Sequence, residues 1–160
     1  MFNSLKTEDI NSNYQMMVDS AKAFCEDEDD LIALLSNLSA LINFYMDNIN
    51  WVGFYLFNGK ELVLGPFQGL PACTRISPGK GVCGTAFAEK KPLIVEDVHQ
   101  FPGHIACDSA SLSELVLPFF KNGDVFGVLD LDSPKKCRFT KTEAEYLSQI
   151  SGFLTHFLEK

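Results

Sequence analysis

The sequence predicts an α+β fold in which a central antiparallel β-sheet is flanked by helices on both faces. Apolar residues recur at helical spacing near both ends of the chain. Between these ends, short apolar runs are joined by turn sequences, and strands joined by tight turns pair in antiparallel fashion. The length of 160 residues suits one domain, with N-terminal helices (1–50), a sheet with candidate active-site loops (51–139) and a C-terminal helix (140–160).

Two helices are expected within the first 50 residues. The first has apolar residues that share one helical face, namely Tyr14, Met17, Val18, Ala21 and Phe24. The second helix, over about residues 30–47, has a longer apolar stripe rich in leucine and isoleucine. The acidic run at residues 26–30 places carboxylates at the start of this second helix, where the helix dipole favours negative charge.

The next segments predict a hairpin and a short helix. Residues 51–57 and 61–64 are apolar runs on either side of Asn58 and Gly59, a pair typical of a two-residue hairpin turn. A glycine-rich turn then leads into a short helix within residues 79–91, which ends before Pro92.

The last third of the chain predicts a strand, a long loop, a second hairpin and a helix. Residues 93–98 are expected to form the strand, and residues 99–111, which show no period, the loop. Two apolar runs, 114–120 and 125–131, flank the sequence Lys-Asn-Gly-Asp and predict the hairpin. Thr140, with Glu143 three residues later, has the capping-box pattern that begins the C-terminal helix.

Composition limits the partners and the location. The formal net charge of −8 argues against nucleic acid or an anionic membrane as the main partner, because both select basic surfaces. No apolar run approaches the ~18 residues of a membrane span. The N-terminus lacks the basic start and apolar stretch of a signal peptide, so a cytoplasmic protein is expected. In that reducing compartment, the five cysteines are core thiols, metal ligands or redox reagents rather than permanent disulfides.

Paired acids at one end of the second hairpin are the first candidate site. Asp130 and Asp132 are two apart on a strand and share a face, as in a solvated strand end or in a functional site. Glu114 opens the partner strand. A two-residue turn pairs Glu114 with Leu131 and puts it on the wrong face, whereas a three-residue loop or a bulge near Pro118 pairs it with Asp132. The sequence leaves this register open.

Aromatic residues and glycines offer further candidates. Trp51 and Tyr55 lie on one face of a strand, as core residues or as the wall of a small-ligand pocket. The run from Gly79 to Gly84 matches the glycine pattern of dinucleotide sites, but no apolar strand directly precedes it, and the following acids come too early. Free N–H groups at this turn are instead candidates to bind a carboxylate or another anion.

The spacing of the histidines and cysteines argues against a metal site and against a hydrolase site. His99, His104 and Cys107 lack the paired spacing of standard zinc ligands. Cys73 and Cys83 complete a set of four ligands only if the fold brings them close to these residues. Cys107 and His104 are also close enough in sequence for a cysteine–histidine hydrolase, but no hydrolase signature surrounds them. We therefore expect no metal.

The motifs resemble those of one family. The sequences "NWVGFY", "GKGVCGTA", "EDVHQFPGHIACDSASLSELVLP" and "GVLDLDSP" are similar to those of the GAF-domain free methionine-(R)-sulfoxide reductases, over essentially the whole chain. Cys73, Cys83 and Cys107, which are separated by ten and twenty-four residues, are the most specific part of the resemblance. Most GAF domains are ligand sensors without these cysteines. Cys25 and Cys137 lie outside the pattern.

The resemblance implies a reaction and roles for the matched residues. The substrate is free L-methionine-(R)-sulfoxide, Cys107 is the attacking thiol, and Cys73 and Cys83 are candidate resolving thiols. Glu114, Asp130 and Asp132 are the polar groups around the sulfoxide and the substrate ammonium, and Trp51 and Tyr55 line the pocket.

The implied chemistry agrees with the residue types. Clustered carboxyl groups raise one another's pKa, which suits Asp132 or Glu114 as donor of the proton that the leaving oxygen needs. Cysteine sulfenic acid then condenses with a second cysteine. The resemblance also implies recycling by thioredoxin and a homodimer, and no cofactor is needed. The alternative is a GAF domain that binds a small ligand or senses redox state.

Overall fold

One antiparallel sheet separates two apolar cores in this computed structural model, which describes residues 5–104 and 108–160. Within these residues the sheet has six strands in the order β3-β2-β1-β6-β5-β4. The elements in chain order are α1 (Ile10–Asp27), α2 (Leu31–Tyr45), β1 (Trp51–Phe57), β2 (Leu62–Gly69), β3 (Arg75–Ile76), α3 (Gly81–Glu89), β4 (Leu93–Val95), the 3₁₀ helix η1 (Val98–Gln100), β5 (Ser113–Lys121), β6 (Asp124–Ser133) and α4 (Lys141–Leu158).

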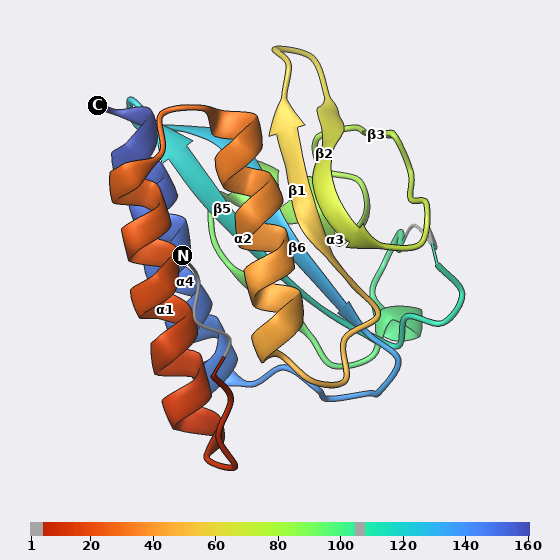
Figure 1. Ribbon diagram of the computed structural model, residues 1–160. Coiled ribbons are helices and arrows are strands. Elements are labelled where there is room, and N and C mark those ends of the chain that lie inside the picture. The colour runs from red at the N-terminus through yellow and green to blue at the C-terminus, as the bar shows by residue number, and fades with distance from the viewer. Residues whose placement is uncertain (1–4, 105–107) are drawn as a thin grey trace.

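The larger core lies between the sheet and three helices. Helices α1, α2 and α4 cover one face of the sheet, with α1 and α4 side by side (Figure 1). Alternate strand residues face these helices and are fully buried, among them Phe54 of β1, Leu117 of β5 and Leu131 of β6. Burial of so many large apolar side chains is the main favourable contribution to folding.

The opposite face of the sheet carries α3 and the long loops. The residues between those of the larger core face this side, and they form a smaller core with α3 that includes Val116 and Val128. This core also includes Trp51, Tyr55 and Cys83. The sheet therefore has helices on both faces, which confirms the predicted fold class.

Most predicted elements occur, with changes at their ends. Helix α2 begins after the Asp30 cap, whose carboxylate accepts from the Ala33 N–H. Thr140 and Glu143 form the predicted capping box of α4. The second strand of the first hairpin extends to Gly69 rather than residue 64. Its partner β3 was not predicted, because two residues carry no recognisable period. The strand expected at 93–98 ends at Val95.

The register of the second hairpin combines a two-residue turn with a bulge. Asn122 and Gly123 form the turn, both with positive φ, and Lys121 pairs with Asp124. The register then shifts between Phe119 and Phe120, because β6 has one extra residue there.

This bulge decides where Glu114 lies. Beyond it, Glu114 pairs with Asp132, as the sequence predicted for a bulge near Pro118. The Phe120 N–H at the bulge donates to Thr155 Oγ1 of α4 at 3.0 Å, so the irregular backbone is tied to the helical layer.

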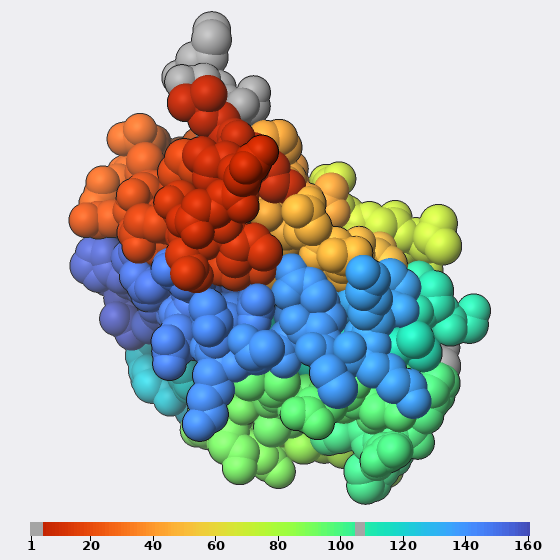
Figure 2. Space-filling view, turned by 90° about the horizontal axis from the view of Figure 1, so that it is seen from below, coloured from red at the N-terminus to blue at the C-terminus, as the bar shows by residue number. Residues whose placement is uncertain are grey.

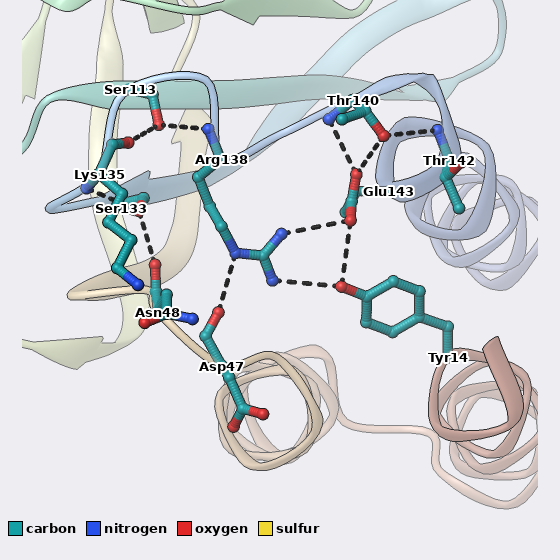
Figure 3. A network of polar contacts seen from close by, with 10 residues as sticks. All are labelled: Tyr14, Asp47, Asn48, Ser113, Ser133, Lys135, Arg138, Thr140, Thr142 and Glu143. Carbon is teal, nitrogen blue, oxygen red and sulfur yellow. Dashed lines mark hydrogen bonds and ion pairs between the residues drawn. The ribbon is translucent and has the colours of Figure 1, made fainter. Parts of the chain in front are cut away.

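A polar network fixes the segment that follows β6 (Figure 3). The Arg138 guanidinium donates to the Asp47 carbonyl at 2.9 Å, to Glu143 Oε1 at 3.2 Å and to the Tyr14 hydroxyl at 3.2 Å. These partners lie after α2, in α4 and in α1, so one side chain ties the three helices to the end of the sheet. The segment runs across the surface between α1 and the loops around α3 (Figure 2).

Two serines continue the network to the ends of β5 and β6. Ser113 Oγ donates to the Lys135 carbonyl and Ser133 Oγ donates to the Asn48 carbonyl, both at 2.6 Å (Figure 3). Each serine directly neighbours an acid of the candidate site, Glu114 or Asp132. The network therefore positions the strand ends that carry these acids. No helix in the described part of the chain is long and apolar enough to cross a membrane.

Candidate active site

A pocket lies on the α3 face of the sheet. Its empty volume is about 530 Å³, open solvent at its mouth included. The described residues that line it come from β1, β5, β6, the start of α3 and two loops. They are Trp51, Tyr55, Leu70, Pro71, Ala72, Ile76, Lys80, Gly81, Val82, Cys83, His104, Asp108, Ser111, Glu114, Asp130 and Asp132. Six of the eight site residues predicted from the sequence are among them.

The three predicted acids form one wall of this pocket. Glu114 and Asp132 lie opposite each other on β5 and β6, and Asp130 is two residues before Asp132 on the same face. Glu114 and Asp130 are only 6% and 5% exposed, and Asp132 is partly buried. The reading of these acids as a solvated strand end is therefore wrong.

Burial raises the pKa of all three carboxyl groups. It raises the pKa of Asp130 to about 6. For Glu114, burial and the charges of Asp130 and Asp132 raise the pKa well above the usual value. For Asp132, burial and the charges of Asp130 and Asp108 do the same. Close carboxylates repel each other in a site that water barely reaches, so the cluster holds protons near neutral pH.

Cys83 adds a thiol to the acid wall. It lies in the first turn of α3, is 3% exposed, and its Sγ lies 3.8 Å from Glu114 Oε1, to which it donates. Burial, with the charges of Asp130 and Glu114, raises the pKa of this thiol well above its usual value. Cys83 is therefore a neutral thiol and a weak nucleophile in this environment.

The remaining cysteines of the described chain differ in whether they are disulfide-bonded or free. Cys73 is disulfide-bonded, whereas Cys25, Cys83 and Cys137 are free thiols. Tyr55 donates its hydroxyl proton to the Cys73 carbonyl at 2.9 Å, which places Cys73 beside the pocket-lining Ala72. The prediction that Cys107 is the attacking thiol falls on a residue outside the described part of the chain.

Trp51 and Tyr55 form an aromatic wall. Their rings stack with centroids 5.9 Å apart, and the Trp51 ring also stacks on Phe67 at 5.3 Å. The Trp51 indole N–H donates to the Leu70 carbonyl at 3.1 Å. Gly53 makes this packing possible, because a Cβ there would lie 2.6 Å from Trp51 Cη2. The two aromatic residues thus line the pocket and also hold the loop around residues 70–73.

Three polar residues of the site were missed by sequence reasoning. The Asn50 side-chain amide donates to Asp108 Oδ2 at 2.9 Å and to Ser111 Oγ at 3.1 Å, and Asp108 and Ser111 line the pocket. Asn50 stands within a quoted motif, but a loop without a period gives no signal for its partners. The three residues hold the described end of the 108–111 loop against the sheet.

The glycine-rich turn is only partly available to bind an anion. Gly79 N–H donates to the Gly84 carbonyl, Lys80 N–H to the Ser77 carbonyl and Gly84 N–H to the Lys80 carbonyl. The N-terminus of α3 has no side-chain cap, and its first residues Gly81 and Val82 line the pocket. The candidate N–H donors are therefore those at the start of α3 rather than those of the whole turn.

The positions of the histidines do not support the metal-site hypothesis. His99 lies in η1 and is exposed. His104 lines the pocket, its Nδ1 is buried with no hydrogen-bond partner among the described residues, and burial lowers its pKa.

Comparison with known proteins identifies the class of this fold and site. A model of the GAF domain family matches residues 24–159, so the chain belongs to the GAF domain family.

Individual relatives show which group of GAF-domain proteins the chain belongs to. The free methionine-R-sulfoxide reductase of Escherichia coli (strain K12) is 46% identical over 150 residues, which cover 94% of this chain and 87% of that protein. The solved structure of fRMsr of Staphylococcus aureus in its reduced form superposes with a TM-score of 0.88 at 52% identity, covering 91% of this chain and 95% of that chain. The free methionine-R-sulfoxide reductase of Neisseria meningitidis in complex with its substrate gives 0.92 at 40% identity, covering 96% and 93%. The chain thus belongs to the free methionine-R-sulfoxide reductase family, as the motifs predicted.

The buried acids predict an unusual pH dependence of stability. Asp130 has a folded-state pKa above its unfolded value, so the folded protein keeps a proton that the unfolded chain loses as pH rises from about 4 to about 6. The free energy of unfolding therefore falls over this range. Asp130→Asn removes the contribution of Asp130, so its stability relative to wild type should increase by about 2 kcal/mol between pH 4 and pH 8. Urea unfolding at both pH values measures this difference.

The control is Asp124→Asn at the exposed first residue of β6. It should keep the same difference from wild type at both pH values. An Asp130→Asn protein whose stability follows the wild-type pH profile would contradict the effect of burial.

Proposed function

We propose that this chain reduces free L-methionine-(R)-sulfoxide to L-methionine. The observation that carries the proposal is the buried wall of Glu114, Asp130 and Asp132 in a pocket lined by Trp51 and Tyr55. Similarity supports it, because the Escherichia coli and Neisseria meningitidis relatives bear the name of this activity.

The pocket suits a free amino acid. Asp130, whose pKa of about 6 leaves it ionised near neutral pH, has the charge to attract the substrate ammonium, and its Oδ1 is buried with no partner among the described residues. The uncapped start of α3 offers N–H groups for the substrate carboxylate, and Lys80 lines the same pocket. The aromatic wall suits the sulfoxide side chain. Recognition of both the ammonium and the carboxylate excludes sulfoxide inside a peptide.

The first chemical step is proposed for Cys107. Its thiolate attacks the positively polarised sulfoxide sulfur, and the oxygen must be protonated as the electron pair of the S–O bond is displaced. Asp132 or Glu114 donates this proton, because burial and the neighbouring charges raise the pKa of these two carboxyl groups well above the usual value. The protonated oxygen leaves as water, and the Cys107 sulfur stays bonded to the substrate sulfur as a sulfonium. Water then attacks the Cys107 sulfur, methionine leaves with the electron pair of the sulfur–sulfur bond, and Cys107 becomes a sulfenic acid.

The second step closes a disulfide. We propose that Cys73 condenses with the Cys107 sulfenic acid and releases water. Cys73 is disulfide-bonded, whereas Cys83 is a buried free thiol whose raised pKa opposes thiolate formation. Cys83 is then a backup or relay thiol. An external dithiol resets the pair, and thioredoxin is the reductant that we propose. A homodimer and a cytoplasmic location complete the proposal and rest on the family resemblance and the sequence.

The first test is substrate specificity. We expect NADPH oxidation, in an assay coupled through thioredoxin and its reductase, with free methionine-(R)-sulfoxide. The (S) form and a peptide containing methionine sulfoxide should give at least about tenfold lower kcat/KM, because the pocket must hold both ends of the amino acid. Binding of the free sulfoxide without release of methionine would instead favour a ligand-sensing GAF domain. Equal rates on the peptide would refute the enclosed pocket.

The second test addresses the proton donor. Asp132→Asn should lower kcat for free methionine-(R)-sulfoxide by about 10²- to 10⁴-fold, because an amide cannot protonate the leaving oxygen. Far-UV circular dichroism checks that the variant folds, and Asp124→Asn serves as the matched control at an exposed site. Wild-type turnover by Asp132→Asn would remove this residue from the mechanism.

The third test identifies the resolving thiol. The reduced protein is given one equivalent of sulfoxide without reductant, and its cysteines are alkylated and mapped. We expect Cys107 linked mainly to Cys73, and Cys83 alkylated only after unfolding because it is buried. Cys137→Ser should give the same map, because Cys137 is exposed and outside the pocket lining. A dominant Cys83–Cys107 disulfide would reverse the assignment.

A further inference from the structure

One sulfur and two carboxyl oxygens converge in the buried wall of the pocket. Cys83 of α3, Glu114 of β5 and Asp130 of β6 each offer a ligand atom, and these three atoms lie within 4.8 Å of one another. In a tetrahedral zinc site, Zn–S and Zn–O bonds of ~2.3 and ~2.1 Å separate neighbouring ligand atoms by roughly 3.5 Å. The observed 3.8 Å between Cys83 Sγ and Glu114 Oε1 is close to that separation.

An unused acceptor in the same wall points to a positively charged ligand. Asp130 is 5% exposed, and its Oδ1 is buried with no hydrogen-bond partner among the described residues. A buried carboxylate oxygen without a partner is costly, and a cation that binds it removes that cost.

We infer that Cys83, Glu114 and Asp130 bind Zn²⁺, and that the bound ion inhibits the enzyme by competing with the substrate. The donor set selects the metal, because Ca²⁺ and Mg²⁺ take oxygen ligands, whereas Zn²⁺ binds thiolate and carboxylate together. Binding displaces the thiol proton of Cys83 and the carboxyl proton of Glu114, and both are released to solvent. The competition rests on the proposed function; the binding of the ion does not.

The excess of acidic side chains around the pocket supports binding of a divalent cation. Among the described residues that line the pocket, four carry carboxyl groups and one is a lysine, Lys80. The three metal-binding residues leave the fourth tetrahedral position toward the pocket, where water completes the set. The substrate ammonium is proposed to use the same acid wall, so the ion and the free amino acid exclude each other.

This site differs from the one weighed in the sequence. The zinc hypothesis drawn from the sequence groups His99, His104 and Cys107, with Cys73 and Cys83 to complete the set. The present site shares only Cys83 with it, and its three members are separated by 31 and 16 positions in the chain. They meet because the bulge in β6 places Glu114 on the face that α3 covers. No spacing motif encodes such a set.

Cobalt is the probe for the binding site, because Co²⁺ binds at zinc sites and a thiolate ligand gives it a charge-transfer band in the near ultraviolet. The titration uses the full chain with Cys73→Ser, Cys107→Ser and Cys137→Ser, under anaerobic conditions. We expect one equivalent of Co²⁺ to give the band and Zn²⁺ to displace it. Adding Cys83→Ser should abolish the band, whereas adding Cys25→Ala, at the other buried free cysteine, should preserve it.

A second variant keeps the test decisive if Cys83→Ser does not fold. Glu114→Gln retains the thiol but removes a charged ligand, so it should weaken Co²⁺ affinity at least about tenfold, and circular dichroism checks its fold. Three results overturn the site: no band at saturating Co²⁺ in the folded protein, a band that survives Cys83→Ser, or unchanged affinity in Glu114→Gln.

Single-turnover kinetics tests the competition separately. Pre-reduced wild-type protein is mixed with free methionine-(R)-sulfoxide with and without Zn²⁺, and released methionine is quantified, so that thioredoxin is absent. We expect Zn²⁺ to slow release and a higher sulfoxide concentration to restore the rate. Inhibition that no sulfoxide concentration relieves would overturn the competition. If no methionine forms without Zn²⁺, the proposed function fails, and the cobalt titration still decides the metal site.

Discussion

The register of the β5–β6 hairpin is the constraint on which the site depends. Side chains alternate between the two faces of the sheet, so a shift of one residue would turn Glu114 toward the helical core. The tight turn at Asn122 and Gly123 alone sets that wrong register, and the extra residue of β6 corrects it. Because Thr155 of α4 binds the irregular backbone at Phe120, the helical layer helps to hold the register of the pocket on the opposite face.

The position of the acids also explains how the fold tolerates them. A buried carboxyl group destabilises a protein when it must ionise, and here three lie together on one face. The opposite face of the same strands carries fully buried leucines and phenylalanines that pack on α1, α2 and α4. The Arg138 network then ties these helices to the strand ends beside Glu114 and Asp132. The larger core thus offsets a cost that the pocket face imposes, and the raised pKa values of Glu114 and Asp132 favour their neutral forms.

Sequence reasoning predicted those features that have a local pattern. The helices, both hairpins and the capping box at Thr140 follow from periodicity and turn chemistry, and the shared face of Asp130 and Asp132 follows from strand geometry. The position of Glu114 did not, because a bulge has no fixed sequence signature. The contact of Cys83 with Glu114 and the loop anchored by Asn50 join segments about 30 and 60 residues apart, and no spacing rule describes them. The roles expected for the site residues came from the family resemblance, whereas the contacts between these residues could be seen only in the structure.

The environment of Cys83 bears on how the proposed chemistry is divided among the cysteines. A thiol that attacks must ionise easily, whereas Cys83 is buried against carboxyl groups that oppose its ionisation. The same groups that keep Cys83 protonated are those proposed to protonate the leaving oxygen, so a wall that supplies protons cannot also supply the nucleophile. We therefore propose that the nucleophile comes from outside the acid wall, as in the role proposed for Cys107. A bound metal ion would have the opposite effect on Cys83, because coordination replaces the thiol proton and stabilises the thiolate. The proton-rich wall that we propose for reduction therefore also offers ligands to the thiophilic cation proposed above.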